Sequence, residues 1–357
     1  MNRPRIAIVA PTLDILGGQG IQARALLEHL REDGYDVTLV PVNPGFPGAL
    51  GVVRRLPYAR TALNQMLYLP ALRALRAVDV VHVFSASYWS FLLAPVPAIV
   101  AARMLGKRVV LNYHSGEADD HLTRWGVAVH PWLRMVDEIV VPSGYLRLVF
   151  ASHGYPARVV RNVVDLSRFV YRDRHPLRPR LLSTRNLERH YRVDRTLEAF
   201  AMVKASYPEA TLTVAGIGSE SSRLDALARS LCIDGITFVG RVEPEDMPRL
   251  YDEADIFLNS SVVDNQPLSV LEALASGLPV VSTATGDIGS MVTDGETGVL
   301  IPHDDPAAMA KAAIALLGDP DAARVMARRG RGEVLRYTWP RVREEWARVY
   351  ACEGVMP

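Results

Sequence analysis

Residues 264–281 read DNQPLSVLEALASGLPVV, and this stretch predicts a loop, a short helix and the start of a strand. The apolar run before it, residues 255–260, is typical of a buried strand. Pro267 suits a first helical position because its missing N–H has no partner there, and the Gly-Leu-Pro sequence at 277–279 marks a stop. We therefore expect a helix over about 267–276 that follows the carboxyl end of a parallel strand.

The junction between this strand and this helix is the first candidate site. Open α/β sheets bind ligands beyond the carboxyl ends of their strands, and the unpaired N–H groups of a helix N-terminus favour a phosphate. Asp264 precedes the helix, and Glu272 lies about one and a half turns inside it with its side chain leaning toward the N-terminus. One anionic ligand could contact both side chains. The structural alternative is that Asp264 and Asn265 cap the helix while Glu272 is solvated.

Composition indicates a globular protein with room for two domains in 357 residues. The two cysteines, Cys232 and Cys352, are too few and too far apart for a disulfide framework or a metal cluster, which favours a cytosolic protein. We expect no secretory signal at the start of the chain. The longest apolar stretch, residues 91–105, is shorter than the roughly 20 residues that span a bilayer, so we expect a buried helix there.

Charge is unevenly distributed along the chain. Through Val170 there are 18 Arg and Lys against 12 Asp and Glu, whereas the remainder has 22 against 27. Residues 48–60 combine apolar side chains with Arg54, Arg55 and Arg60, and Arg73 and Arg76 follow. Two interpretations stay open: peripheral contact with an anionic membrane surface or acceptor, and a solvated arginine-rich loop. No nucleic-acid-binding motif accompanies these residues.

Strand-like runs alternate with helical patterns throughout, which predicts parallel βαβ construction. Residues 171–179, YRDRHPLRP, are charged and poor in apolar side chains, so we expect the interdomain linker there. The prediction is two doubly wound domains facing a cleft, over 1–170 and 180–338, with a last helix in 339–357 packing back on the first domain. The expected strands are 5–10, 37–42, 79–84, 108–113, 138–141 and 158–164, then 180–183, 211–215, 236–239, 255–260 and 280–283.

Two glycine-rich turns follow predicted strands. Gly17, Gly18 and Gly20 open a helix after the first strand, and Gly216 and Gly218 lie in AGIGS at 215–219. Both turns resemble phosphate-cradling loops but lack a full GxGxxG. A tight strand-to-helix turn that needs small residues is the alternative.

Single side chains at strand ends complete the candidates. His114 in LNYHSG lies where such sheets bind ligands, although a lone histidine is more often structural; His82 inside VVHVF is expected in the core. Arg185 ends a strand and could hold a phosphate bidentately, with Arg192 nearby. Asp119 and Asp120 form no metal-binding DxD motif and are expected to be solvated or helix-capping.

With these motifs in place, the chain resembles the family 4 retaining glycosyltransferases, which have two Rossmann-like domains in the GT-B arrangement. The resemblance rests on GGQGIQARALLEHL, the strand-end His114, NVVDLSRF before the linker, AGIGS, and DNQPLSVLEALASGLPVVST followed by DGETGVLIPHDDP. It covers nearly the whole chain. It implies transfer of a sugar from a nucleotide diphosphate sugar, which we expect to be UDP-linked, with retained anomeric configuration and no metal or other cofactor.

The resemblance also implies roles for individual residues. Glu272 would bind the ribose hydroxyls, and Asp264 stands where the family usually has a glutamate near the donor sugar. Arg185 matches the diphosphate-binding arginine. His190 replaces the lysine expected five residues later, so His190 or Arg192 must supply the missing charge. His114 would hold the donor sugar or line the reaction face. The remaining positions implied in donor binding are Gly17, Gly18, Gly216, Gly218, Arg241, Val242, Asn265, Gln266, Leu268 and Ser269.

Two alternatives to transfer stay open. One is an epimerase or phosphorylase of the same architecture. The other is a catalytically impaired member that binds a nucleotide sugar or a partner enzyme, suggested by His190 and by the shorter Asp264. The acceptor is expected to be lipid-linked, a polysaccharide or a small molecule.

Overall fold

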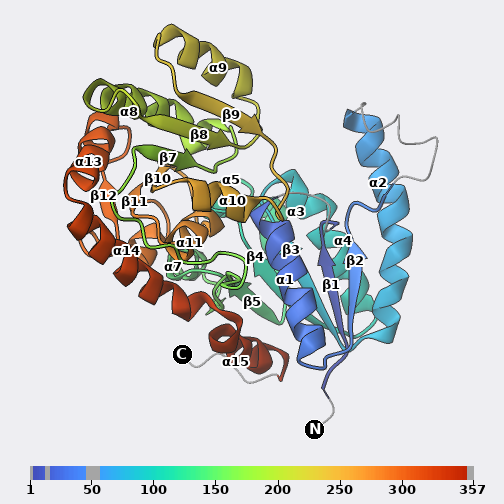
Figure 1. Ribbon diagram of the computed structural model, residues 1–357. Helices are drawn as coiled ribbons and strands as arrows, with labels where there is room; N and C mark the ends of the chain where they lie inside the picture. The colour runs from blue at the N-terminus through green and yellow to red at the C-terminus, as the bar shows by residue number, and fades with distance from the viewer. Residues whose placement is uncertain (1–2, 13–16, 46–56, 352–357) are drawn as a thin grey trace. The chain divides into compact units, whose positions relative to one another are not determined.

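The computed structural model describes residues 3–12, 17–45 and 57–351. The chain forms two compact units, one made of Met1–Arg161 with Val342–Pro357 and the other of Asn162–Arg341. Each unit contains a six-stranded sheet in which every neighbouring pair of strands is parallel, with helices covering the sheet (Figure 1). The expectation of two parallel, Rossmann-like α/β domains is confirmed.

The first unit has the strand order β2-β1-β3-β4-β5-β6. Its central strands are buried along almost their whole length because helices cover both faces of a parallel sheet. The strands are β1 (Ile6–Ala10), β2 (Val37–Pro41), β3 (Val80–Ser85), β4 (Arg108–Tyr113), β5 (Glu138–Val141) and β6 (Arg158–Val159). The helices are α1 (Gly18–Glu32), α2 (Pro57–Ala71), the 3₁₀ helix η2 (Leu72–Ala77), α3 (Trp89–Leu93), α4 (Pro95–Met104), α5 (Ala118–Arg124), α6 (Gly126–Leu133) and α7 (Gly144–Ser152).

The second unit has the order β12-β11-β10-β7-β8-β9, so β10 and β7 are neighbours at its centre. Its strands are β7 (Arg180–Ser183), β8 (Thr211–Ala215), β9 (Ile236–Gly240), β10 (Ile256–Asn259), β11 (Val280–Thr283) and β12 (Val299–Ile301). The helices are η3 (Arg189–Tyr191), α8 (Val193–Ser206), α9 (Ser221–Ser230), α10 (Met247–Glu253), α11 (Leu268–Ala275), α12 (Ile288–Met291), α13 (Pro306–Gly318), α14 (Pro320–Val334), η4 (Leu335–Tyr337) and the start of α15 (Trp339–Tyr350).

Some expected elements differ from the structure. The apolar stretch 91–105 is not one buried helix: Ala94 separates α3 from α4, and Met104 is exposed. The break coincides with Pro95, which suits the first turn of a new helix better than the interior of a continuing one. The run 158–164 is a strand only at Arg158–Val159, because the chain passes into the second unit at Asn162. The short strand β12 was not expected.

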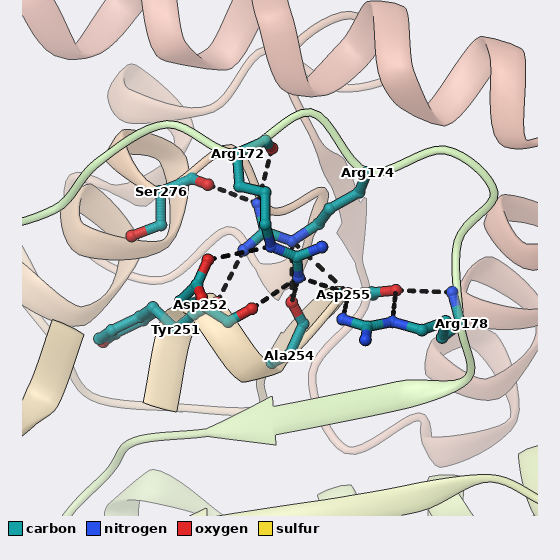
Figure 2. A network of polar contacts seen from close by, with 8 residues as sticks. All are labelled: Arg172, Arg174, Arg178, Tyr251, Asp252, Ala254, Asp255 and Ser276. Carbon is teal, nitrogen blue, oxygen red and sulfur yellow. Dashed lines mark hydrogen bonds and ion pairs between the residues drawn. The ribbon is translucent and has the colours of Figure 1, made fainter. Parts of the chain in front are cut away.

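Residues 171–179, expected as the linker, belong to the second unit, and the division between units falls at 161/162. The reason is Asp255, whose fully buried carboxylate accepts hydrogen bonds from Arg172 Nη2 at 2.8 Å and from Arg178 Nη2 at 2.8 Å (Figure 2). Arg174 Nε lies 3.7 Å from the same carboxylate. Three arginines of the segment expected as a linker are therefore partners of one buried carboxylate, and Arg174 is itself buried.

The end of the chain groups with the first unit from Val342 onward. Trp346 and Tyr350 of α15 are buried, and the Tyr350 hydroxyl lies 2.8 Å from His82 Nδ1 in β3. His82 is fully buried, as expected of a core residue. The amphipathic pattern of α15, in which Val342, Trp346 and Val349 recur at helical spacing, accounts for this packing.

The basic stretch 48–60 lies mostly outside the described residues, and Arg54 and Arg55 with it. Arg60, Arg73 and Arg76 are exposed on α2 and η2. Among the residues that the structure describes, every helix is too short or too polar to cross a bilayer.

Candidate functional site

The helix α11 is the buried centre of the candidate site. It runs from Leu268 to Ala275, so Pro267 is the residue before the helix, with φ −70° and ψ 124°, rather than its first helical residue. From Ser269 onward every residue of the helix is buried. A helix that is apolar on nearly all sides must lie inside the domain, and its N-terminus opens at the carboxyl end of β10.

Arg185 and Asp264 form an ion pair beside this N-terminus. Arg185 follows β7 and Asp264 follows the neighbouring strand β10, so both lie at the same edge of the sheet. Arg185 Nη2 donates to Asp264 Oδ2 at 2.5 Å, and Nη1 donates to the Ser269 hydroxyl at 2.8 Å. The Arg185 guanidinium carbon also lies 4.2 Å from the centre of the Tyr191 ring. Its buried Nε–H has no acceptor among the described residues.

Glu272 is buried, contrary to the alternative that placed it in solvent: only 9% of the residue is exposed. The Tyr251 hydroxyl, from α10, donates a hydrogen bond to Glu272 Oε2 at 2.8 Å. Burial raises the pKa of the Glu272 carboxyl to about 7, although the Tyr251 hydrogen bond and the charges of Arg168 and Arg185 act in the opposite direction. Glu272 therefore changes its ionisation near neutral pH.

The loop 264–266 is tied to two other segments of the second unit. Asn162, in the NVVDLSRF motif, donates from its backbone N–H to Gln266 Oε1 at 2.7 Å and from Nδ2 to the Gln266 carbonyl at 2.9 Å. Gln266 Nε2 donates to Asp287 at 3.2 Å. The buried Asn265 accepts from the Asp287 backbone N–H through its carbonyl. These contacts give Asn265 and Gln266 structural partners.

The AGIGS turn between β8 and α9 packs directly on the chain that carries Arg185. A Cβ atom at Gly216 would lie 2.2 Å from the Arg185 carbonyl oxygen, and one at Gly218 would lie 2.3 Å from that of Leu187. Gly216 also has φ +148°. Both glycines are therefore required by close backbone approach, which is the structural alternative for this turn.

His190 and Arg192, the two side chains expected to supply the charge of the missing lysine, have different surroundings. The half-buried His190 ring lies against Tyr191, with 4.2 Å between the ring centres. Arg192 pairs with Asp194 at 3.2 Å and with Asp304. The charge of Arg192 is thus already balanced by two carboxylates.

The remaining expected donor positions of this unit lie at its surface or in its core. Arg241 pairs with Glu243 at 2.9 Å on the surface. Val242 and Leu268 are partly buried against the hydrophobic core, and Ser269 is the hydroxyl partner of Arg185 already described.

His114 lies in the first unit, directly after β4. Its backbone N–H donates to the Ser85 carbonyl at 3.1 Å, and its ring stacks on Phe84 with 5.3 Å between ring centres. Burial lowers the pKa of His114 to about 4, so the imidazole is neutral at pH 7, and its buried Nε2 has no partner among the described residues. Gly17 and Gly18 begin α1 after β1 of the same sheet, and a Cβ at Gly17 would meet no atom within 4 Å.

Asp119 and Asp120 are both in the first turn of α5 and have partners. Asp120 accepts from the Tyr88 hydroxyl at 2.7 Å and pairs with Arg124, while Asp119 lies 3.1 Å from His153. Within residues 3–12, 17–45 and 57–351, no group of three or more His, Cys, Asp or Glu side chains is arranged to hold a metal ion.

Known proteins share both the sequence and the fold. Residues 16–168 match the model of Glycosyltransferase Family 4, and residues 172–333 match that of Glycosyl transferases group 1. Glycogen synthase of Mycobacterium tuberculosis is 30% identical over 288 residues, which is 76% of this chain and 68% of that protein. This chain belongs to glycosyltransferase family 4. It is a glycosyltransferase with the GT-B fold.

A second curated relative and a solved structure extend the comparison. The N-acetyl-alpha-D-glucosaminyl L-malate synthase of Bacillus anthracis is 25% identical over 361 residues, covering 89% of each chain. Anabaena HepE, solved in complex with UDP and glucose, superposes with a TM-score of 0.75 at 16% identity, covering 98% of this chain and 99% of that one. At 16% identity, the similarity to HepE supports only the fold of this chain.

Two residues of this glycosyltransferase site were missed by sequence reasoning. Tyr251 appears in the sequence as one apolar position of a short helix, and nothing local indicates that its hydroxyl reaches Glu272. Asn162 lies in a motif that was recognised, but its contact with Gln266 joins positions 104 residues apart. Only the folded chain reveals either partner.

Proposed function

We propose that this family 4 glycosyltransferase moves a sugar from a uridine diphosphate sugar to an acceptor hydroxyl, with retention of anomeric configuration and without a metal ion. The observation that carries the proposal is the Arg185–Asp264 pair at the N-terminus of α11. A cation and a helix N-terminus together suit a diphosphate, because both stabilise negative charge.

Arg185 would stabilise the leaving diphosphate. Its guanidinium is oriented by Asp264, by the Ser269 hydroxyl and by the Tyr191 ring, and its Nε–H remains available as a further donor. Charge that develops on the leaving phosphates during transfer is stabilised most by groups that are already oriented.

The two carboxylates would contact different parts of the donor. Asp264 would lie near the sugar and its anomeric carbon, and Glu272 would accept hydrogen bonds from the ribose hydroxyls. His114, a neutral imidazole with an unpartnered Nε2, would contribute a hydrogen-bonding group for the sugar from the first unit. Closure that excludes water would favour transfer over hydrolysis.

UDP is proposed as the nucleotide because Anabaena HepE, which has the same fold, was solved with UDP. The acceptor is proposed as a hydroxyl on a polysaccharide, a lipid-linked molecule or a small molecule. This breadth is supported by two relatives that are named as synthases of different products, glycogen and N-acetyl-alpha-D-glucosaminyl L-malate.

The test is a thermal-shift and hydrolysis screen of the purified protein against UDP-, GDP-, ADP- and dTDP-sugars, with and without EDTA. We expect stabilisation by a UDP-sugar and slow release of UDP that EDTA does not change. The variant Arg185→Ala should lower this release by about 100-fold or more. The control Arg249→Ala removes an exposed arginine of α10 and should leave the release unchanged. Binding of no nucleotide sugar up to millimolar concentration would contradict the proposal.

A second candidate function is binding of a nucleotide sugar without transfer. The observation that favours it is the shortage of free positive charge: His190 replaces the lysine, and Arg192 is paired with Asp194 and Asp304. Stabilisation by a UDP-sugar, with no release of UDP and no transfer to any hydroxyl compound tested, would support this candidate instead.

We also propose that the basic first unit makes peripheral contact with anionic membrane surfaces through α2. Tyr58, Met66 and Leu69 are exposed apolar side chains on this helix, together with exposed Arg60. Such a combination suits the headgroup region of a bilayer. Co-flotation with vesicles containing anionic lipid, abolished by Arg60→Glu with Met66→Glu, would support the proposal, and recovery of the wild-type protein only in the lipid-free fraction would contradict it.

A further inference from the structure

Resting on the proposed function, we infer that Tyr251 is a positioning residue for Glu272: its buried hydroxyl holds one carboxylate oxygen and leaves the other for the ribose of the donor. Tyr251 is fully buried on α10, and its hydroxyl donates to Glu272 Oε2 at 2.8 Å. Glu272 Oε1 has no hydrogen-bond donor among the described residues. The carboxylate thus has one oxygen engaged and one free.

The Tyr251 hydroxyl has two further polar neighbours, the Thr184 hydroxyl and the Ser269 carbonyl oxygen, which at 3.2 Å is a more distant acceptor than Glu272 Oε2 at 2.8 Å. Thr184 Oγ1 lies 2.7 Å from Tyr251 Oη. A phenol has one proton, so when Tyr251 donates to Glu272 its oxygen accepts the proton of Thr184. Thr184 directly precedes Arg185 at the exit of β7. The chain from Thr184 through Tyr251 to Glu272 therefore connects the segment that carries the proposed diphosphate ligand with the proposed ribose ligand.

The helices that carry Tyr251 and Glu272 are held together by one buried guanidinium (Figure 2). Arg174 donates to the carbonyls of Tyr251 at 2.7 Å and Ala254 at 2.8 Å, at the end of α10. It also donates to the carbonyl of Ser276, at the end of α11. A cation that binds the free carbonyls at two helix C-termini stabilises both ends and fixes their spacing. The distance between Tyr251 and Glu272 is thereby set by the fold.

The electrostatic surroundings agree with this arrangement. The charged groups that act on Glu272 are Arg168 and Arg185, and both favour its ionised form, as does the Tyr251 hydrogen bond. Burial acts against all three and is the largest influence on the pKa of Glu272. Burial also raises the pKa of Tyr251 well above 10, so its hydroxyl keeps its proton and remains a donor throughout the working pH range.

The first test needs no donor. The titration of the Glu272 side-chain carboxyl is followed by carbon-13 NMR in the full-length protein and assigned with Glu272→Gln. In Tyr251→Phe the midpoint should rise by about one pH unit or more, because a buried carboxylate loses its hydroxyl donor. Thr184→Val, which removes the hydroxyl behind Tyr251 with little change of shape, should raise it less. An unchanged midpoint in both variants would overturn the inference.

The second test measures recognition of the ribose. Calorimetry compares the affinity for UDP with that for 2′,3′-dideoxy-UDP. The wild-type protein should prefer UDP by about tenfold or more, and Tyr251→Phe should reduce this preference several-fold by weakening UDP binding alone. The control Tyr68→Phe deletes another buried tyrosine hydroxyl, which donates to the Ala94 carbonyl at 2.7 Å in the first unit, and should keep the full preference.

The outcomes separate this inference from the proposed function. A wild-type protein that binds no UDP contradicts the proposed function, while the NMR titration still decides whether Tyr251 controls Glu272. Normal UDP binding with the ribose preference intact in Tyr251→Phe contradicts the positioning role alone. A loss of affinity for both nucleotides to the same extent would indicate general damage to the fold and also contradict it.

Discussion

Glu272 shows how burial changes the chemistry of a single carboxyl group. The sequence places it on a helix, and the fold removes it from water, with Tyr251 as its one hydrogen-bond donor within the part of the chain that the structure describes. Its pKa rises from the ordinary value of 4.5 to about 7, so folding favours the protonated form. The contribution of Glu272 to the free energy of unfolding is therefore largest below pH 4.5, and this contribution is lost as the pH rises from 4.5 to 7.

We expect Glu272→Gln to stabilise the protein at alkaline pH, because the amide needs no ionisation in its buried position. The gain at pH 8 should be on the order of 3 kcal/mol or less, and it should shrink as pH falls toward 4.5. Urea unfolding at several pH values measures it. The control Glu209→Gln changes an exposed glutamate and should have almost no effect at any pH. A gain that does not depend on pH would show that the charge is not its cause.

The turn between β8 and α9 illustrates a glycine requirement set by a neighbouring segment. Gly218 has no positive φ, yet a Cβ there would overlap the carbonyl of Leu187, whose backbone N–H donates to the Ile217 carbonyl at 3.0 Å. The turn and the segment 185–187 pack backbone against backbone. A methyl group on the turn must therefore displace the segment that carries Arg185.

Gly218→Ala should weaken binding of a UDP-sugar by about tenfold or more, since Arg185 shifts with its backbone. Isothermal titration calorimetry measures this. Gly332→Ala is the matched control: its Cβ meets no atom within 4 Å in α14, and the change should stabilise that helix slightly without altering affinity. Equal affinity in Gly218→Ala and the wild type would mean that the turn can move without moving Arg185.

The Asp255 carboxylate holds the segment 171–179 in the second unit by accepting hydrogen bonds from Arg172 and Arg178. Burial by itself raises the pKa of Asp255, but hydrogen bonds from Arg178 and Arg172 more than offset it, and the net pKa lies below the ordinary value. Such a carboxylate stabilises the fold above its unfolded pKa and loses this contribution as pH falls. Burial in turn lowers the pKa of Arg174 to about 10, which leaves it charged at neutral pH.

Asp255→Ala should destabilise the second unit by about 3–5 kcal/mol, because Arg174 keeps its buried charge without a carboxylate partner. Guanidinium-induced unfolding gives the free energy directly. Asp252→Ala removes a carboxylate that is 64% exposed and pairs with the same Arg172, so it should cost about 1 kcal/mol or less. If Asp255→Ala and Asp252→Ala lowered the free energy of unfolding by similar amounts, the larger contribution expected of the buried carboxylate would be contradicted.

Residues of α15 contribute to the stability of the first unit. The last helical residues, from Val342 onward, group with a sheet that the chain built more than 180 residues earlier. Trp346 is buried against His82, with 5.0 Å between the ring centres, and stacks on Tyr350. The first unit is thus complete only when the end of the chain is present.

Trp346→Ala should destabilise the first unit by about 3–5 kcal/mol. Hydrogen exchange followed by mass spectrometry should show faster exchange in peptides of β1 and β3, with peptides of the second unit much less affected. Trp89 is 65% exposed, so Trp89→Ala is expected to leave these rates nearly unchanged. Unchanged protection of β3 in Trp346→Ala would mean that α15 contributes little to the first sheet.

Much of the architecture could be predicted from local patterns. The strands 108–113, 138–141, 180–183, 211–215 and 280–283 have the predicted bounds, because a buried parallel strand is an apolar run whose ends are marked by its immediate neighbours in sequence. The helix after Pro267 and the family membership follow in the same way from contiguous motifs. Arg185 and Asp264 could be chosen as candidates because each follows a predicted strand, and Glu272 because it lies inside the helix that comes next in the chain.

What only the tertiary structure decided was which groups meet. Arg185 and Asp264 are 79 residues apart, and they pair because β7 and β10 are neighbours in the sheet. The packing of α10 against α11 likewise sets the partner of Glu272, while contacts between distant segments bury Asp255 and pair Arg192 with Asp304. The interactions of a side chain depend on the positions of all segments around it, whereas the periodicity that reveals a strand or helix depends on a few adjacent residues. For this reason the elements of this glycosyltransferase could be predicted from its sequence, and the ionisation and pairing of its candidate site residues could not.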